Sequence, residues 1–554
     1  MAHPMFVKHQ DLLGSAVHAI ESRGGWSAYS DDLATYGGVE AVEETRQAFF
    51  EAYSDAQFYL DQPGVVGRGG GETSPYGISL NVSYPKCSAE ALIDAAKAAM
   101  PNWVKAGPDV RAGVCAEILA RLNTSSIEMA FATMHTTGRS FAAAFLDGGP
   151  RAQERGLEAV AGAWREMKHV PYRATWDRKR GSRMPIRLEK RFAVVPRGVA
   201  LSFTCASAPT WSSYPGIFAS LVTGNAVVVK PHPEAILPLA IAVANIRQTL
   251  KDAGFNPDLC SLLVDTAEAA VGRDIALKPD IRIVDYAGDA EFGEWLEENL
   301  RDALLFSEKP GIGCIVVDGA SDYLGMLDNI ALALVTNAGQ RRGTPQTILV
   351  SRQGIHTPSV IIPPERFGPD LARAIGRLVE DTRGACELLG AIRSPATLAR
   401  LAALAEAGEI LRAGDSIAHP EWPGAAVRTP LLLGVPADAG ELWMEEQLAP
   451  VAFVVEAATT AQSLAYAERA IREKGALSLA IYSDNENIVQ LAEEVSLRTG
   501  TALAVNLTGD VVANDSAPFS DYRASGVNRA ARGCLTDAGF VAARFAVVES
   551  LRNG

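Results

Sequence analysis

From residue 186 onward, short apolar runs rich in β-branched residues alternate with longer stretches of helical periodicity. Apolar runs of this length predict buried strands, and the amphipathic stretches between them predict helices. The first series predicts strands at residues 186–190, 192–195, 199–204, 226–230, 261–264, 281–286 and 304–306, with helices at 211–222, 236–253 and 291–302. Such regular alternation is typical of a parallel sheet with right-handed crossovers, a Rossmann-like layer.

A second series of the same texture follows and predicts a second α/β domain of comparable size. Its expected strands are 314–317, 347–350, 431–435, 451–455, 478–481 and 502–506, and its expected helices are 323–338, 371–379 and 461–473. The tail holds one more apolar run, residues 540–548, which predicts a terminal strand. Because an apolar edge strand is hazardous alone, we expect it to pair with another subunit or domain.

The first part of the chain reads differently. Residues 1 to about 85 are polar and helical, then loop-rich, and residues 89–167 have helical periodicity with expected breaks at Pro101, Pro108 and 148–150. The glycine-rich run 67–71 lacks the Lys-Ser/Thr and the flanking strand of a phosphate loop, so we interpret it as a surface loop.

Composition and charge exclude some classes of binding partner. The chain has 554 residues, 48% hydrophobic and 21% charged, and a net charge of −14, which disfavours nucleic acid. No run approaches the ~20 apolar residues of a bilayer span, so no membrane partner is expected. The seven cysteines are scattered without CxxC spacing, which indicates reduced cytoplasmic thiols and no zinc or other metal site.

Polar residues gather where predicted strands end. Lys230 closes a strand in the segment 223–231, at the edge where open α/β sheets bind ligands, and its ammonium suits ribose hydroxyls or a phosphate. Gly288 and Gly293 lie at a strand-to-helix junction and would let a pyrophosphate approach the helix N-terminus. Asp289 between them can cap that helix, but its charge would compete with a phosphate.

Two further segments could supply a reaction centre. Residues 305–313 contain Glu308, a candidate general base, and residues 337–346 read Asn-Ala-Gly-Gln-Arg-Arg-Gly-Thr-Pro-Gln with Arg342 at their centre. A guanidinium cannot act as a nucleophile at neutral pH, because its pKa exceeds ~12.

Together with residues 444–451 and 518–526, these segments resemble the aldehyde dehydrogenase superfamily over about residues 85–554. The features at 209–211, 214–216, 230–233 and 71–77 resemble its phenylacetate-degradation ring-cleavage semialdehyde dehydrogenases (PaaN type). The resemblance implies an α/β fold with a Rossmann-like cofactor domain, a second α/β catalytic domain and a small β oligomerisation element. It divides the chain into an N-terminal extension and first part of the cofactor domain (1–172), oligomerisation strands (173–196), a cofactor domain (197–309), a catalytic domain (310–517) and a closing segment with an oligomerisation strand (518–554).

The resemblance also implies site residues. The cofactor would be NADP or NAD, because Pro233 stands where an acid that disfavours the 2′-phosphate would often lie. The expected cofactor contacts are Thr204, Lys230, His232, Gly288, Asp289, Gly293 and Glu446, and the expected catalytic residues are Glu308, Arg342, Cys205 and Ser207. A homodimer or homotetramer acting on a small molecule is also implied.

Three positions depart from the family's pattern. Arg342 stands in the place of the nucleophilic cysteine, 34 residues after Glu308, Ser207 lies where an oxyanion-binding asparagine is expected, and Asp289 replaces a serine. Cys205 lies within two residues of the missing asparagine and could supply the thiol, with its pKa lowered by Arg342 if the two are close.

Three functions stay open from the sequence. The first is an NAD(P)-dependent oxidoreductase that lacks the family's cysteine route and acts on an aromatic-derived or coenzyme A-linked carbonyl or imine compound. The second is a non-redox enzyme that uses Glu308 as base and Arg342 as an anion clamp, and the third is a catalytically silent partner in which Arg342 pairs with Glu308.

Overall fold

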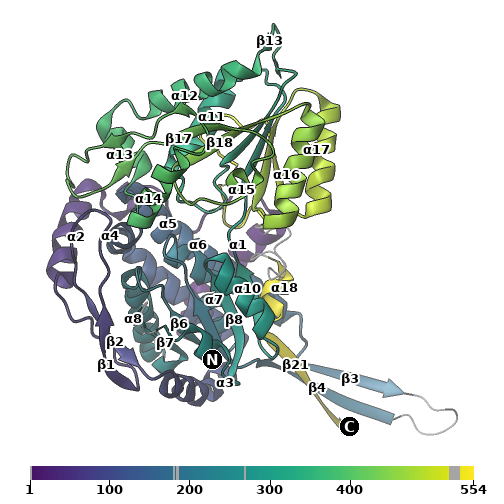
Figure 1. Cartoon of the computed structure of the whole chain (residues 1–554). Coiled ribbons are helices and arrows are strands. Elements are labelled where there is room, and N and C mark those ends of the chain that lie inside the picture. The colour runs from purple at the N-terminus through teal and green to yellow at the C-terminus, as the bar shows by residue number, and fades with distance from the viewer. Residues whose placement is uncertain are drawn as a thin grey trace.

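The computed structural model describes residues 3–178, 181, 186–266, 270–513, 515–522 and 537–553. It is an α/β protein with two sheet-centred parts and a projecting arm (Figure 1). The lower part in that view holds a five-stranded parallel sheet in the order β7-β6-β5-β8-β9. Its strands are β5 (Val199–Phe203), β6 (Ala226–Lys230), β7 (Cys260–Leu262), β8 (Ile281–Ala287) and β9 (Leu304–Glu308), and its helices are α7 (Pro209–Val222), α8 (Leu237–Asp252), α9 (Gly272–Ala276) and α10 (Ala290–Asn299). The Rossmann-like layer predicted from the apolar pattern is therefore confirmed.

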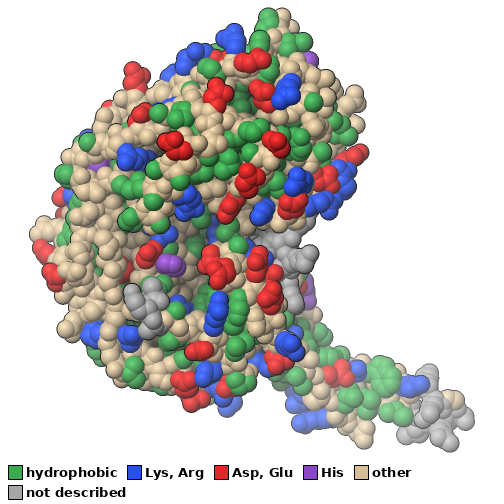
Figure 2. Space-filling view, in the orientation of Figure 1, with side chains coloured by type: hydrophobic (Ala, Val, Ile, Leu, Met, Phe, Trp, Pro, Cys, Tyr) green, Lys and Arg blue, Asp and Glu red, His purple; other side chains and the backbone are tan. Residues whose placement is uncertain are grey.

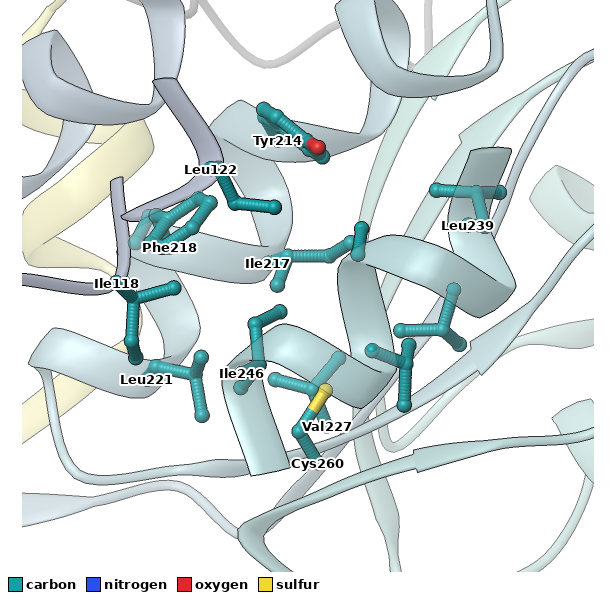
Figure 3. Close-up of a cluster of buried hydrophobic side chains, with 14 of the residues drawn as sticks. Ile118, Leu122, Tyr214, Ile217, Phe218, Leu221, Val227, Leu239, Ile246 and Cys260 are labelled. Atoms are coloured by element: carbon teal, nitrogen blue, oxygen red, sulfur yellow. The ribbon is translucent and has the colours of Figure 1, made fainter. Parts of the chain in front are cut away.

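Helix α7 lies at the centre of the core that packs against one face of this sheet (Figure 3). Its side chains Tyr214, Ile217, Phe218 and Leu221 are almost completely buried. They face Ile118 and Leu122 of a preceding helix on one side and Leu239 and Ile246 of α8 on the other, with Val227 and Cys260 on the strands below. Burying this much apolar surface fixes the sheet edge from which the site loops emerge.

The described N-terminal segment adds six helices, of which α3 packs directly against the sheet: α1 (Pro4–Ser22), α2 (Gly38–Tyr53), α3 (Ala89–Thr124), α4 (Ser126–Thr137), α5 (Phe141–Gly148) and α6 (Pro150–Lys168). The break at 148–150 is confirmed, but α3 continues through Pro101 and turns at Gly107, whose φ is +82°. Trp103, just past Pro101, is fully buried and donates to the Leu221 carbonyl oxygen. This packing explains why the proline does not end the helix.

The interpretation of residues 67–71 as a loop is wrong. Residues Val65–Gly70 form β1, which pairs antiparallel with β2 (Ser83–Cys87), although every residue of β1 is at least partly exposed. Gly70 has a φ of +147° and lies against the Val82 carbonyl, so its lack of a side chain permits the pairing.

The upper part holds a seven-stranded sheet in the order β14-β17-β18-β11-β10-β19-β20, in which only β14 is antiparallel to its neighbour. Its strands are β10 (Cys314–Val317), β11 (Thr347–Ser351), β14 (Glu409–Arg412), β17 (Leu431–Val435), β18 (Val451–Ala457), β19 (Ser478–Tyr482) and β20 (Ala502–Val505). Its helices are α11 (Tyr323–Val335), α12 (Phe367–Leu378), α13 (Thr382–Leu389), α14 (Pro395–Leu404), α15 (Gly440–Trp443), α16 (Thr460–Lys474) and α17 (Glu486–Thr499). Short pairs β12 (Ile355–His356) with β13 (Ile361–Ile362) and β15 (Ser416–Ile417) with β16 (Val427–Arg428) complete it.

The arm is a three-stranded sheet of β3 (Arg173–Arg178), β4 (Ile186–Pro196) and β21 (Phe545–Asn553), with β4 in the middle (Figure 1). The two strands expected at 186–190 and 192–195 are one continuous strand. The terminal strand starts later than expected, because residues Ala538–Ala542 form helix α18. It pairs antiparallel with β4 of its own chain, so of the two partners expected, another subunit or another domain, the structure shows the second.

Candidate active site

The carboxyl ends of the parallel strands meet the second domain at two neighbouring cavities. The larger cavity, about 230 Å³, is lined by six of the residues expected from the sequence: Cys205, Ser207, His232, Gly288, Asp289 and Arg342. The smaller cavity, about 30 Å³, is lined by Cys205, Ser207, Glu308 and Arg342, with Trp211 and Asp147 among its other walls. Arg139, Cys205, Ser207 and Arg342 line both cavities. These four residues therefore stand between them.

Arg342 is held by the backbone on two sides. Its guanidinium donates to the carbonyl oxygen of Glu308 (2.6 Å) and to that of Gly288 (2.9 Å), and its Nη1 lies 3.8 Å from the Glu308 carboxylate. Burial alone would lower the pKa of Arg342, but the nearby Glu308, Cys205 and Glu446 outweigh burial, so the pKa lies above its ordinary value. Arg342 is thus a fixed cation that joins the end of β9 to the loop before α10.

The loop that carries Arg342 is backbone-strained. Three consecutive residues, Asn337, Ala338 and Gly339, have φ values of +52°, +49° and +64°. Left-handed conformations of non-glycine residues cost free energy and gather at functional sites. Asn337 is 4% exposed, lines the larger cavity, and its Oδ1 has no hydrogen-bond partner among the described residues. A buried, unpartnered acceptor of this kind is suited to a donor on a ligand.

Cys205 presents a thiol at the junction of the two cavities. Its Sγ lies 3.4 Å from the Ser212 hydroxyl and 3.7 Å from the Ser207 hydroxyl. Five other described cysteines, Cys87, Cys115, Cys260, Cys314 and Cys386, have pKa values that burial raises above the ordinary value. Cys205 is the described thiol that lines both cavities.

Two of the expected cofactor contacts, Lys230 and Thr204, do not line the larger cavity but lie within two residues of His232 and Cys205, which do. Lys230 ends β6, and its ammonium pairs with the buried Asp265 carboxylate at 2.7 Å. Thr204 follows β5, is 5% exposed, and its hydroxyl has no hydrogen-bond partner among the described residues. The charge of the Lys230 ammonium is therefore already balanced by Asp265, whereas the Thr204 hydroxyl, among the described residues, has a hydrogen bond still to form.

The loop at 288–293 is more closed than the sequence indicates. Asp289 caps α10 as expected, accepting from the Phe292 backbone N–H at 2.8 Å. A Cβ at Gly288 would meet the Tyr286 hydroxyl, and a Cβ at Gly293 would meet the Lys309 side chain. The space that these glycines provide is thus filled by the chain's own side chains.

Glu446 faces a different opening. It is not among the described residues that line the larger cavity, and it borders an acid-lined cleft of about 940 Å³ between the two parts of the molecule. Acidic side chains gather over α10 at this hollow (Figure 2). The Glu446 carboxylate accepts from the backbone N–H groups of Gly343 (2.9 Å) and Gly311 (3.3 Å). Burial raises its pKa to about 7, although Arg342 and these two donors oppose the shift.

The cavity residues that sequence reasoning missed include three arginines and an asparagine. Arg139 lies in the turn between α4 and α5, Asn337 lies in the Arg342 loop, and Arg393 and Arg400 flank or belong to α14. Asn337 stands inside the quoted motif and could have been singled out, but nothing in the spacing of the arginines signals that they share a cavity.

These residues fit a dinucleotide of the kind that the resemblance implies. The larger cavity presents Arg139, Arg342, Arg393 and Arg400 in a chain whose net charge is −14, and arginine forks match phosphate oxygens. The unpartnered Thr204 hydroxyl offers a further contact. Asp289 opposes the fit through its charge. Among the described residues no set of His, Cys, Asp or Glu is grouped to hold a metal ion, and no helix is long and apolar enough to cross a membrane.

Comparisons with known proteins agree with this fold. A family model described as "Aldehyde dehydrogenase family" matches residues 82–535. The crystal structure of an NAD-dependent aldehyde dehydrogenase from Burkholderia multivorans is 42% identical, covers 100% of both chains and superposes with a TM-score of 0.97. The NADP-dependent succinate-semialdehyde dehydrogenase GabD of Escherichia coli (strain K12) is 24% identical over 81% of this chain and 88% of its own. A Thermus 1-pyrroline-5-carboxylate dehydrogenase with bound NAD, 16% identical, shares the fold with a TM-score of 0.73 over 96% of this chain and 99% of its own.

Proposed function

Because the chain belongs to the aldehyde dehydrogenase family, we propose that it is an NAD(P)-dependent oxidoreductase in which Cys205 provides the thiol that position 342 lacks. The observation that supports this most is the smaller cavity, which Cys205, Glu308 and Arg342 all line. A thiol, a carboxylate and a cation in one pocket are the groups that nucleophilic addition to a carbonyl needs.

The substrate class follows from the same walls. Trp211 offers a flat apolar surface in the smaller cavity, and Arg341 and Arg342 offer guanidinium groups that match a carboxylate or phosphate. An aromatic-derived or coenzyme A-linked carbonyl or imine compound combines both features. Its anionic part would meet the arginines and its apolar part would meet Trp211.

The chain's residues then divide the work. The Cys205 thiolate adds to the carbonyl carbon, so a sulfur–carbon bond forms and the carbonyl π pair moves to the oxygen. Ser207 and Arg342 line both cavities and offer donors to that oxygen. Glu308 in the smaller cavity accepts a proton, first from the thiol and later from the water that releases the product. NAD(P)⁺, when bound, accepts a hydride.

The cofactor would be held mainly at the larger cavity. Arg393, Arg400 and His232 would contact its charged part, Thr204 its sugar end, and Lys230 could join if it exchanged its pairing with Asp265. NADH and NADPH titrations, followed by fluorescence and by melting temperature, test this directly, because a ligand that binds the folded state raises Tm. Saturable binding of either nucleotide supports the proposal, and no change at millimolar nucleotide contradicts it.

One observation favours a second candidate, a catalytically silent partner. Arg342 donates to the carbonyl oxygens of Glu308 and Gly288, as expected of a residue that fills a vacated site. In that case nucleotide binding and aldehyde-dependent reduction of NAD(P)⁺ would both be absent from the purified chain. Turnover with any aldehyde of a panel that includes phenylacetaldehyde removes this candidate.

We also propose that the chain assembles as a homodimer or homotetramer through the arm. The arm exposes Trp176, Ile186, Val547, Val548 and Leu551. Apolar side chains on a projecting sheet are typical of subunit contacts. Light scattering of a Val547→Lys, Leu551→Lys variant should show a smaller particle, and an unchanged mass would contradict this role.

A further inference from the structure

Arg139 carries an inference that goes beyond the proposed function, and it rests on Cys205 being the nucleophile. We propose that Arg139 is the charge partner of Cys205: its guanidinium stabilises the thiolate and then the oxyanion that forms when the thiolate adds to a carbonyl carbon. In that step a sulfur–carbon bond forms, the carbonyl π pair becomes the oxyanion lone pair, and the thiol proton passes to Glu308. No oxidant is consumed in this addition.

Placement is the first argument. Arg139 is 7% exposed and is one of the four residues that line both cavities, together with Cys205 itself. Its Nε donates to the Ser207 carbonyl oxygen at 3.1 Å, which fixes it two residues from the thiol. The guanidinium is further anchored by an ion pair with Asp147.

Arg139 can also replace a hydrogen-bond donor that the site lacks. The loop after β5 contains no asparagine that could donate an amide to an oxyanion, and Ser207 offers one hydroxyl. Removing such a donor from an enzyme typically lowers kcat by about 100- to 1000-fold. A guanidinium has five N–H donors, two sets of which are engaged here by Ser207 and Asp147. The remaining donors can serve an oxygen at the junction of the cavities.

The larger cavity contains a buried polar atom that a ligand could satisfy. Asn337, nine-tenths or more buried, lines the larger cavity with an unpartnered Oδ1. A polar acceptor left unsatisfied beside Cys205 and Arg139 indicates a built site, because buried polar groups are otherwise hydrogen-bonded. The junction is therefore more than an isolated cysteine.

Other charges also face Cys205. From the smaller cavity these are Asp147, Glu308, Arg341 and Arg342. From the larger cavity they are His232, Asp289, Arg393 and Arg400, and the Tyr286 hydroxyl group also interacts electrostatically with Cys205. Burial lowers the pKa of Arg139, and Asp147 and Cys205 oppose that shift, which agrees with a guanidinium that senses the thiol. Arg342 also interacts electrostatically with Cys205, so the Arg139 variants measure the contribution of Arg139 against a constant Arg342.

The test is the pH dependence of Cys205 alkylation by iodoacetamide in the full-length protein, read by peptide mapping so that other cysteines do not contribute. Arg139→Gln should slow labelling of Cys205 at pH 7 about tenfold, since an adjacent cation favours the thiolate. Arg139→Lys should recover most of the rate. Asp147→Asn should shift the profile the opposite way, because it leaves Arg139 without its counter-charge.

Opposite shifts from the two halves of one ion pair are not expected of a purely structural pair. An Arg139→Gln protein that is folded by circular dichroism and has an unchanged labelling profile would overturn the inference. If Arg139→Gln does not fold, Asp147→Asn decides alone, and an unchanged profile in that variant overturns it equally. Failure of the proposed function is detected by a different measurement: turnover of aldehyde would persist in Cys205→Ser.

Discussion

Two loops face each other across the site, and they differ in how fully their side chains are satisfied. In the loop 337–346, Arg342 donates to two backbone carbonyl oxygens and lies beside the Glu308 carboxylate. In the loop after β5, the Cys205 thiol lies within hydrogen-bond distance of the Ser212 and Ser207 hydroxyl groups and lines both cavities. In the proposed function this difference separates two roles: Glu308 and Arg342 hold the first loop in place, and the reactive thiol belongs to the second loop.

The largest effect should come from removing the thiol of the second loop. Cys205→Ser should lower aldehyde-dependent reduction of NAD(P)⁺ by at least ~1000-fold, because loss of a nucleophile leaves only binding and electrostatic effects. The absorbance of NAD(P)H at steady state measures it. Cys87→Ser is the matched control, since Cys87 is a buried cysteine bonded to Gln62, and its activity should be close to wild type. Equal activity in Cys205→Ser and Cys87→Ser would contradict the assignment of Cys205 as the nucleophile.

The next effect concerns the surroundings of Arg342. The pKa of Glu446 is raised from 4.5 to about 7 in the folded protein, so the fold holds a proton there that the unfolded chain has released. Between these values the free energy of unfolding therefore falls as pH rises, by about 3 kcal/mol in total for this group. Urea unfolding of wild type and Glu446→Gln at pH 5 and pH 8 isolates the contribution, because other groups cancel in the difference. The variant should gain more stability relative to wild type at pH 8 than at pH 5, and an equal difference at both pH values would contradict the assignment.

A smaller effect should follow when the thiol is moved back to the first loop. In a Cys205→Ser background, Arg342→Cys with Ser207→Asn should raise turnover about tenfold above that of Cys205→Ser alone, since a thiolate beside Glu308 is again available. Binding of NADPH, measured by fluorescence, serves as the control for an intact cofactor site. Continued silence with NADPH still bound would show that the first loop no longer supports thiol chemistry.

The smallest effect belongs to α10. Asp289→Asn keeps a side chain that can cap the helix but removes a negative charge from its N-terminus, and such charges contribute about 0.3–1 kcal/mol at helix ends. The Kd of NADPH should fall about threefold, as measured by fluorescence titration. An increase in Kd would show that the carboxylate helps to hold the cofactor.

The fold was predictable from the sequence because buried parallel strands are continuous apolar runs, as at Ala226–Lys230 and Leu431–Val435, whose bounds are confirmed. Elements that depend on tertiary contacts were not predictable. The strand at Val65–Gly70 has no apolar alternation and exists because β2 pairs with it. Likewise α3 passes Pro101 because Trp103 packs against α7.

The site was predictable where residues share a motif and not where they share only space. Cys205, Glu308 and Arg342 come from segments recognised along the chain, and the structure places them on one small cavity. Arg139 lies 66 residues before Cys205, in a turn between helices, and only the packing of α4 and α5 on the sheet brings it there. Glu446 illustrates the opposite case, because a motif residue turned away from the larger cavity towards two backbone N–H groups.

The most direct test of Cys205 as the nucleophile is to find the covalent intermediate. Protein mixed with NAD(P)⁺ and phenylacetaldehyde, or another aldehyde that it turns over, is quenched in acid within the first turnovers and mapped by peptide mass spectrometry. The account predicts an acyl group on the peptide that contains Cys205, absent from Cys205→Ser. Turnover with no acyl group on that peptide would contradict it.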